Sequence, residues 1–302
     1  MDIKKYEGII PAFYACYAED GSISPERVRA LCEYLIQKGV RGLYVGGSSG
    51  ECIYQTVAER KLVLETVMAV AKGRVTVIAH VACNSTMESC ELAAHAESLG
   101  VDAIAAIPPI YFKLSDRAIA QYWNDISAAA PNTDFIIYNV PQLAGVALNV
   151  PLMKTMLENP RVIGVKNSSM PVLDIQNWRT TGAPVVMNGP DEQIFAGLMA
   201  GATGGIGGTY AVMPELYMYI YNAVKHGGDL VKALRVQDGV NDIITMLCSG
   251  QGCMYAMIKE TLRVMGGPDC GSVRPPFFPI QPGDEKIAEK CAQMIRSLIA
   301  SL

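Results

Sequence analysis

The segment FIIYNVPQLAGVALNVPLMKTMLENPRVIGVKNSS, residues 135–169, contains two short apolar runs, FIIYNVP at 135–141 and VIGVK at 162–166, with a longer helical pattern between them. Near-continuous apolar runs rich in valine and isoleucine are typical of parallel strands that are covered on both faces. Two such strands that flank a helix form the repeating unit of α/β proteins. The segment therefore predicts a parallel sheet covered by helices.

The same alternation extends from residue 8 to about residue 226. Thr56 with Glu59, and Ser85 with Glu88, predict capping boxes at the start of the second and third helices. Eight strands, each followed by a helix, fit a (β/α)8 TIM barrel of the α/β class better than an open Rossmann sheet. The strand-like runs are 8–15, 42–47, 75–82, 103–108, 135–141, 162–166, 184–189 and 204–210.

The pattern changes after the eighth unit, where strand-like runs stop. Three further helical segments follow near 230–247, 252–265 and 284–300, separated by glycine- and proline-rich loops. We therefore expect a catalytic barrel over residues 1–226 and a C-terminal three-helix extension over residues 227–302.

Composition excludes several classes of protein. Half of the 302 residues are hydrophobic, 18% are charged and the formal net charge is −4, which argues against disorder and against binding to nucleic acid or an anionic membrane. The N-terminus lacks the apolar core of a signal peptide, and the nine cysteines form no CxxC pair. These features predict a cytoplasmic protein with reduced thiols.

The three histidines lie near no cluster of side chains with the spacing of metal ligands, so no metal site is expected. His80, late in the third strand, is interpreted as a core residue with satisfied hydrogen bonds.

In a TIM barrel, the active site lies where the strands end. Lys166 ends the sixth predicted strand, and Tyr138 lies near the end of the fifth, which is its neighbour in a barrel. A lysine at this position often extends into solvent, but an unprotonated amine in a barrel mouth can form a Schiff base with a carbonyl. Tyr138 is either an interior aromatic residue or a proton relay for that chemistry.

Other strand ends carry residues suited to a small polar substrate. Ser48 and Ser49 follow the second strand in a glycine-rich turn without basic residues, which favours a carboxylate over a phosphate. Asp191 and Glu192 follow the seventh strand and either cap a helix or accept hydrogen bonds from a polyol. The glycine-rich run at 204–208 indicates close backbone approach, and a sugar-phosphate enzyme stays an alternative.

Taken together, four motifs resemble the N-acetylneuraminate lyase/dihydrodipicolinate synthase family. They are GGSSGE at 46–51, YNVPQLAG at 138–145, GVKNSS at 164–169 and GPDEQIFAGLMAGATGGIGGTY at 189–210. The resemblance runs over essentially the whole chain. It implies a class I aldolase on a (β/α)8 barrel, usually a homotetramer, that needs no metal or organic cofactor.

The resemblance also implies roles for individual residues. Lys166 would be the Schiff-base lysine and Tyr138 the proton relay, while Ser48 and Ser49 would bind the carboxylate of pyruvate. Ser168 would help to position the substrate. The sugar chain would be held by a segment that contains Gly189, Asp191 and Glu192.

Differences within the family point to its lyase branch. Leu143 replaces the arginine with which dihydrodipicolinate synthases hold the carboxylate of the incoming aldehyde, and a leucine cannot supply that contact. Gly208 lies among the expected substrate contacts at a position where known lyases have a serine, and Pro190 replaces a bulkier residue. Tyr111 corresponds, on a looser alignment, to an aromatic residue that reaches a neighbouring subunit's active site.

The expected reaction is the reversible cleavage of a sialic acid to pyruvate and N-acetylmannosamine. Two alternatives stay open. The first is a related pyruvate-dependent aldolase that acts on another sugar acid or 2-oxo acid. The second is a non-catalytic pyruvate-binding sensor.

Overall fold

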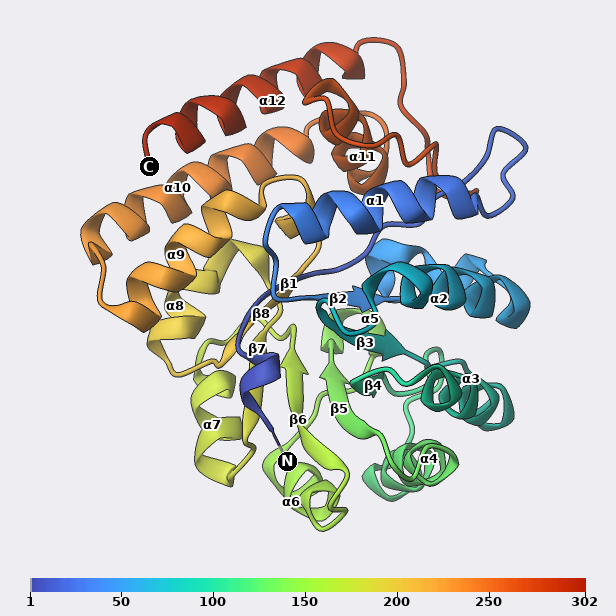
Figure 1. The fold of residues 1–302 in the computed structure, drawn as a ribbon. Coiled ribbons are helices and arrows are strands. Elements are labelled where there is room, and N and C mark those ends of the chain that lie inside the picture. The colour runs from blue at the N-terminus through green and yellow to red at the C-terminus, as the bar shows by residue number, and fades with distance from the viewer. Residues whose placement is uncertain (1) are drawn as a thin grey trace.

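The computed structural model describes residues 2–302 and contains one sheet of eight parallel strands. Neighbouring strands follow chain order from β2 to β8, and β8 pairs with β1. A parallel bridge from Ala12 to Tyr44 brings β1 against β2, so the barrel is nearly closed (Figure 1). The predicted TIM barrel is confirmed. Its strands are β1 (Gly8–Pro11), β2 (Gly42–Val45), β3 (Thr76–His80), β4 (Ala103–Ala106), β5 (Asp134–Asn139), β6 (Val162–Asn167), β7 (Val185–Asn188) and β8 (Gly204–Gly207).

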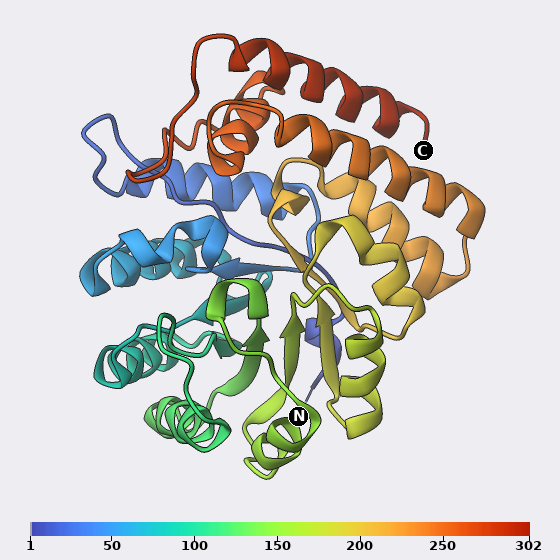
Figure 2. The same cartoon turned by 180° about the vertical axis from the view of Figure 1, so that it is seen from behind.

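A ring of helices surrounds these strands, as the view from behind also shows (Figure 2). The predicted capping box of α2 is present with both of its bonds, whereas at α3 only the bond from the Glu88 N–H to the Ser85 hydroxyl forms. The helices of the ring are α1 (Pro25–Gln37), α2 (Val57–Ala71), α3 (Thr86–Leu99), α4 (Asp116–Ala129), α6 (Val150–Leu157), α7 (Leu173–Thr181), α8 (Ile194–Met199) and α9 (Pro214–His226). The short α5 (Pro141–Ala144) lies instead at the carboxyl ends of the strands, inside the ring.

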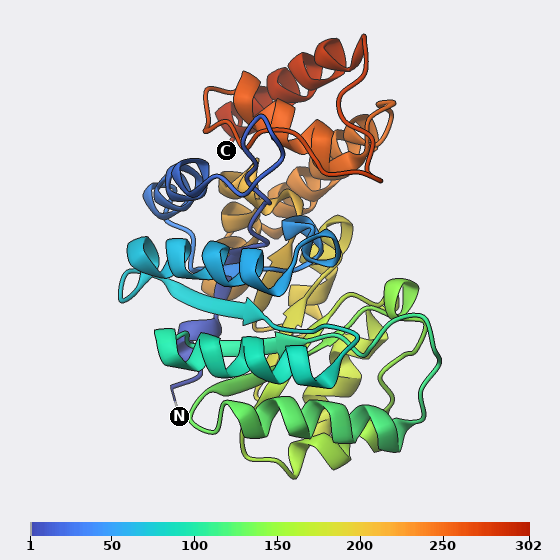
Figure 3. The ribbon, with the colours of Figure 1, turned by 90° about the vertical axis from the view of Figure 1, so that its right-hand side faces the viewer.

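Three C-terminal helices follow the barrel, as predicted. They are α10 (Leu230–Leu247), α11 (Met254–Val264) and α12 (Asp284–Ala300). Helix α10 packs against α8 and α9, and helix α12 packs against α10 and α11. Figure 3 shows these helices, coloured orange to red, gathered at one end of the molecule. Their buried side chains continue the same apolar cluster that fills the space between the barrel strands and the surrounding helices.

A second apolar cluster fills the inside of the barrel. Its members are inward-facing residues of the strands, such as Ile10, Ile78, Ile136 and Ile206, all of which are fully buried. Because packed side chains fill the barrel interior, a ligand can enter only from an end of the barrel. Over residues 2–302, no helix combines the length and apolar character that a membrane span requires.

Candidate active site

A cavity of about 200 Å³ lies at the carboxyl ends of the strands. Every candidate residue from the sequence lines it, with the exception of Tyr111. Strand ends and loops that are far apart in the chain therefore meet at one place. The lining comprises Ala12, Ser48, Ser49, Tyr138, Leu143, Lys166, Ser168, Gly189, Pro190, Asp191, Glu192, Ile206, Gly207, Gly208, Met254, Tyr255 and Ile258.

Lys166 and Tyr138 are direct neighbours in this cavity. They are register partners on β6 and β5, and both are buried, with exposed fractions of 4% and 5%. The Lys166 Nζ lies 3.9 Å from the centroid of the Tyr138 ring and 4.2 Å from that of Tyr44. Among the described residues no carboxylate forms an ion pair with Lys166, so the amine is in contact with aromatic faces instead.

The rings of Tyr44 and His80 pack against the ring of Tyr138. The ring centroids of both lie about 6 Å from that of Tyr138, at 5.9 Å in each case. The Nδ1 of His80 lies 2.9 Å from the Gly46 carbonyl oxygen, and its Nε2 accepts a bond from the Ile107 N–H. Burial lowers the pKa of His80 to about 3, so the ring is neutral at neutral pH. His80 is therefore a satisfied core histidine, as expected.

The turn after β2 presents the two predicted hydroxyls. Ser48, Ser49 and Gly50 form one turn of 3-10 helix, in which Ser49 is buried and Ser48 is half-buried. Within residues 2–302, neither serine hydroxyl is paired with another protein group, which leaves both free for a ligand. The turn ends at Glu51, which has a left-handed backbone with φ of 53°.

Asp191 lies opposite, on a short 3-10 helix after β7 (Asp191–Gln193). Its Oδ2 accepts bonds of 2.7 Å from the Thr209 N–H and 2.6 Å from the Thr209 hydroxyl. Burial nevertheless raises the pKa of Asp191 to about 6, with a smaller contribution from the charge of Glu192. Glu192 itself is exposed at the rim of the cavity.

Ser168 and Gly189 are in close contact at the ends of β6 and β7. The Gly189 N–H donates a 2.7 Å bond to the Asn167 carbonyl. A Cβ atom at Gly189 would lie 2.0 Å from the Ser168 Oγ and 2.7 Å from the Asn167 carbonyl oxygen. Only glycine therefore lets these two strand ends approach with the Ser168 hydroxyl between them.

A buried polar network behind the cavity was not predicted from the sequence. The side chain of Asn167 accepts bonds from the amide of Asn139 at 2.8 Å and the indole of Trp178 at 2.9 Å. Because Asn139 and Asn167 directly follow Tyr138 and Lys166, these bonds fix the ends of the two strands on which the central pair lies. The asparagine in each of the motifs YNVP and GVKN was the only signal for this network.

The C-terminal extension supplies another wall that the sequence did not reveal. Met254, Tyr255 and Ile258 of α11 line the cavity. Nothing in the local pattern of this amphipathic helix distinguishes residues that face the active site from residues that face a core.

Tyr111 lies apart from this cavity. It is 89% exposed, has a left-handed backbone with φ of 88°, and stacks edge-on against Phe112, which is 69% exposed. In its own chain Tyr111 does not contribute to the cavity that contains Lys166. Its predicted contact with a neighbouring subunit stays a prediction.

No group of three or more histidine, cysteine, aspartate or glutamate side chains within residues 2–302 is arranged to hold a metal ion. All nine cysteines are free.

Comparison with known proteins identifies the family of this chain. The model of the dihydrodipicolinate synthetase family matches residues 5–297. The chain belongs to that family. The resemblance predicted from the four motifs is thus confirmed.

Within the dihydrodipicolinate synthetase family, the chain is similar to several lyases. It is 58% identical to the N-acetylneuraminate lyase of Mediterraneibacter gnavus, over 97% of this chain and 94% of that protein. It is 36% identical to N-acetylneuraminate lyase 2 of Escherichia coli O6:H1, over 96% of this chain and 95% of the other. A solved structure of a catalytic lysine mutant of Ruminococcus gnavus sialic acid aldolase has a TM-score of 0.98 and 56% identity, with 99% of each chain covered.

Proposed function

We propose that the protein is a Schiff-base (class I) aldolase, an N-acetylneuraminate lyase that reversibly cleaves N-acetylneuraminate to pyruvate and N-acetylmannosamine. One observation carries the proposal: a buried Lys166 without a carboxylate partner faces the ring of Tyr138 in a cavity that also exposes two free serine hydroxyls. The similarity to N-acetylneuraminate lyases, and to a sialic acid aldolase described as having a catalytic lysine, supports it.

The reaction begins with the formation of an imine. The unprotonated amine of Lys166 attacks C2 of the open-chain substrate, and loss of water with uptake of one proton from solvent gives the protonated imine. The substrate carboxylate binds at the turn of Ser48 and Ser49, where hydroxyl groups and backbone amides are donors. No cation stands in this turn, so neutral donors alone select a group of carboxylate size.

Cleavage of the C3–C4 bond follows. Tyr138 relays the proton of the C4 hydroxyl: its phenol oxygen accepts that proton while its own proton passes to the substrate carboxylate, and the C4 oxygen becomes the aldehyde oxygen of N-acetylmannosamine. The electron pair of the broken bond moves into the protonated imine and gives an enamine on Lys166. Protonation of the enamine at C3 and hydrolysis of the imine then release pyruvate and restore the amine. The lysine is the electron sink, so the proposed chemistry requires no metal or organic cofactor.

The opposite side of the cavity binds the sugar chain. The Oδ1 of Asp191 and the carboxylate of Glu192 accept bonds from its hydroxyl groups, and the Ser168 hydroxyl beside Gly189 adds a contact. Leu143, which is 60% exposed on the cavity wall, offers no charge to a second carboxylate. Gly208 has no hydroxyl to offer and leaves the space beside Ser49 open. A Cβ atom at Gly208 would fill that space, 3.1 Å from the Ser49 Oγ.

The proposal extends to assembly and location. The exposed pair Tyr111 and Phe112 is the surface by which subunits associate, and we propose a homotetramer in which Tyr111 approaches a neighbouring active site. We also treat residues 227–302 as an extension of the barrel of residues 1–226, because α11 lines the cavity. Nine free thiols suit a cytoplasmic protein. Sedimentation of wild type and Tyr111→Ala tests the assembly, for which dissociation of the variant is expected.

A substrate panel tests the reaction. Pyruvate release from N-acetylneuraminate is measured beside release from other sugar acids, and condensation of pyruvate is measured with a set of aldehydes. The highest kcat/KM is expected for N-acetylneuraminate. Faster turnover of another sugar acid or 2-oxo acid would favour a related pyruvate aldolase, and adduct formation without any turnover would favour a pyruvate sensor.

A further inference from the structure

A buried ion pair links the C-terminal extension to the turn that carries Ser48 and Ser49. The Nζ of Lys259, on α11, lies 2.7 Å from the Oε1 of Glu51, and the two side chains have exposed fractions of 3% and 0%. The second carboxylate oxygen of Glu51 accepts a 2.9 Å bond from the Arg274 N–H. Lys259 also donates a 2.8 Å bond to the Ser272 carbonyl, so each charge of the pair has a second hydrogen bond beside the ion pair itself.

Glu51 determines where the serine turn ends. Its N–H donates a 2.9 Å bond to the Ser48 carbonyl, which closes the 3-10 helix of the turn. Its backbone is left-handed, a conformation that L-residues other than glycine adopt only when the surroundings hold them there. The same residue that closes the turn therefore also forms the buried side-chain bonds to Lys259 and to the Arg274 backbone.

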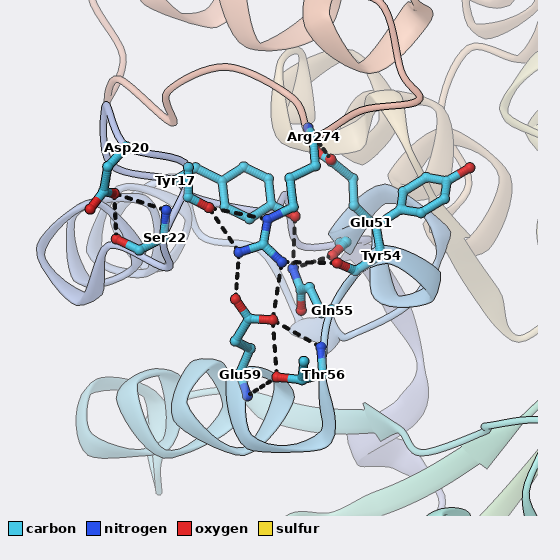
Figure 4. Close-up of polar contacts among 11 residues, drawn as sticks. Tyr17, Asp20, Ser22, Glu51, Tyr54, Gln55, Thr56, Glu59 and Arg274 are labelled. Atoms are coloured by element: carbon cyan, nitrogen blue, oxygen red, sulfur yellow. Dashed lines mark hydrogen bonds and ion pairs between the residues drawn. The ribbon is translucent and has the colours of Figure 1, made fainter.

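The segment beyond the turn is held from the same direction. Figure 4 shows Arg274 reaching from the C-terminal segment to Glu59, beside the ring of Tyr17. The Arg274 guanidinium donates a 2.9 Å bond to the Tyr54 carbonyl and pairs with the Glu59 carboxylate at the start of α2. The end of the turn at Glu51 and the segment after it at Tyr54 are thus both bonded to groups that follow the barrel in sequence.

The same helix also contacts the cavity directly. Tyr255 and Lys259 are four residues apart on α11 and therefore lie on one face of it. Tyr255 lines the cavity, while Lys259 holds Glu51 beside it. One rigid element consequently adjoins both the open cavity and the turn that would bind the carboxylate.

We propose that Lys259 is a positioning residue of the aldolase: through Glu51 it holds the Ser48–Ser49 turn in the geometry that binds the pyruvate carboxylate. This inference rests on the proposed function. It assigns to the C-terminal extension a role in pyruvate affinity, in addition to its role in covering the barrel.

The test measures pyruvate affinity without requiring turnover. The fraction of chain that borohydride traps as a pyruvate adduct is measured against pyruvate concentration for wild type, Lys259→Met and Lys259→Arg. Lys38→Met is the matched control, because it makes the same substitution in the Lys38–Glu215 pair, which joins α1 to α9 and contributes no side chain to the cavity. All proteins are assayed well below their own unfolding temperatures.

Lys259→Met is expected to raise the half-saturating pyruvate concentration roughly tenfold or more, the loss that follows when hydrogen bonds to a charged group are weakened. Lys259→Arg, which keeps the charge, should recover part of the lost pyruvate affinity. The half-saturating pyruvate concentration of Lys38→Met should match that of wild type. KM for N-acetylmannosamine in the condensation reaction should change by less than about twofold, since that ligand contacts the opposite wall.

Unchanged half-saturation in Lys259→Met, with only a lower unfolding temperature, would overturn the inference and leave Lys259 a structural residue. If Lys259→Met does not fold, the double variant Glu51→Gln/Lys259→Met removes both charges together and decides the question by the same readout. Failure of the proposed function is distinguishable, because then the wild-type protein itself would form no adduct.

Discussion

Lys166 and Tyr138 lie opposite one another on adjacent parallel strands, with the Lys166 Nζ 3.9 Å from the centre of the Tyr138 ring. The packed interior of the barrel supports both side chains from below, and the asparagine that follows each of them is tied to the other by a hydrogen bond. This arrangement holds a nucleophile and a proton relay at one point, and no carboxylate among residues 2–302 forms an ion pair with the Lys166 amine.

Tyr138→Phe separates imine formation from bond cleavage. The phenol oxygen is proposed to accept the C4 hydroxyl proton, so its loss should lower kcat by roughly 10²-fold or more, the usual scale of general acid–base catalysis. KM for N-acetylneuraminate and trapping of pyruvate should change little, because the ring and Lys166 remain. Tyr34→Phe, on α1 and outside the cavity, is the control. A kcat equal to that of wild type would remove the assigned role of Tyr138.

Asp191 should make sugar binding depend on pH. Because burial raises its pKa to about 6, the carboxylate that accepts bonds from the sugar is lost as pH falls through that value. KM for N-acetylmannosamine is therefore expected to rise below about pH 6. In Asp191→Asn it should be high at every pH and should show no such transition. A wild-type KM that stays constant between pH 5 and pH 8 would contradict this reading.

The same shift has a consequence for stability. The folded-state pKa of Asp191, about 6, exceeds the reference value of 3.8, so Asp191 contributes stability that is complete below pH 3.8 and is lost as pH rises through about 6. That loss is on the order of 3 kcal/mol at most, from 1.36 kcal/mol for each unit of pKa. The unfolding temperature of Asp191→Asn minus that of wild type should thus be larger at pH 7.5 than at pH 4.5. The opposite ordering in thermal melts would show that the carboxylate is stabilised by folding.

Leu143→Arg tests which acceptor the cavity selects. The side chain is 60% exposed, so an arginine should fit without disturbing the fold. Its guanidinium can bind a carboxylate with two hydrogen bonds, which should shift relative kcat/KM roughly tenfold or more from N-acetylmannosamine towards aldehydes that carry a carboxylate. Leu143→Met controls for changes of shape. An unchanged ratio would place Leu143 outside the acceptor site.

Gly189→Ala should be more harmful than Gly208→Ala. The added methyl group at Gly189 meets the Asn167 carbonyl oxygen at 2.7 Å, whereas at Gly208 its nearest neighbour is the side-chain Oγ of Ser49 at 3.1 Å. Overpacking against backbone costs about 1–3 kcal/mol, so thermal unfolding of Gly189→Ala should begin several degrees lower. KM for N-acetylmannosamine should rise with it. Equal stability of the two variants would contradict the close approach at Gly189.

The barrel and the cluster of candidate residues were predictable because their signals are local. Apolar runs mark the strands, and parallel strands bring their carboxyl ends together wherever they lie in the chain. Boundaries were less accurate: the run 8–15 was taken as one strand, but β1 ends at Pro11. Ala12 to Ala15 are equally apolar because they are buried beyond the sheet, and hydrophobicity alone does not distinguish the two situations.

The parts that the sequence did not reveal depend on long-range pairing. Glu51 and Lys259 are 208 residues apart, and each alone reads as an ordinary charged residue of a turn or a helix. Their burial becomes visible only when α11 packs over the barrel mouth. Tyr44 likewise reads as one residue of an apolar strand, although its ring lies beneath the Lys166 amine.

The most direct test of the account is to treat the protein with pyruvate and borohydride and to map the adduct by mass spectrometry. A single stable modification on Lys166 is expected, together with loss of labelling and of N-acetylneuraminate cleavage in Lys166→Ala. An unmodified Lys166 in the wild-type protein, with cleavage intact in Lys166→Ala, would contradict the account.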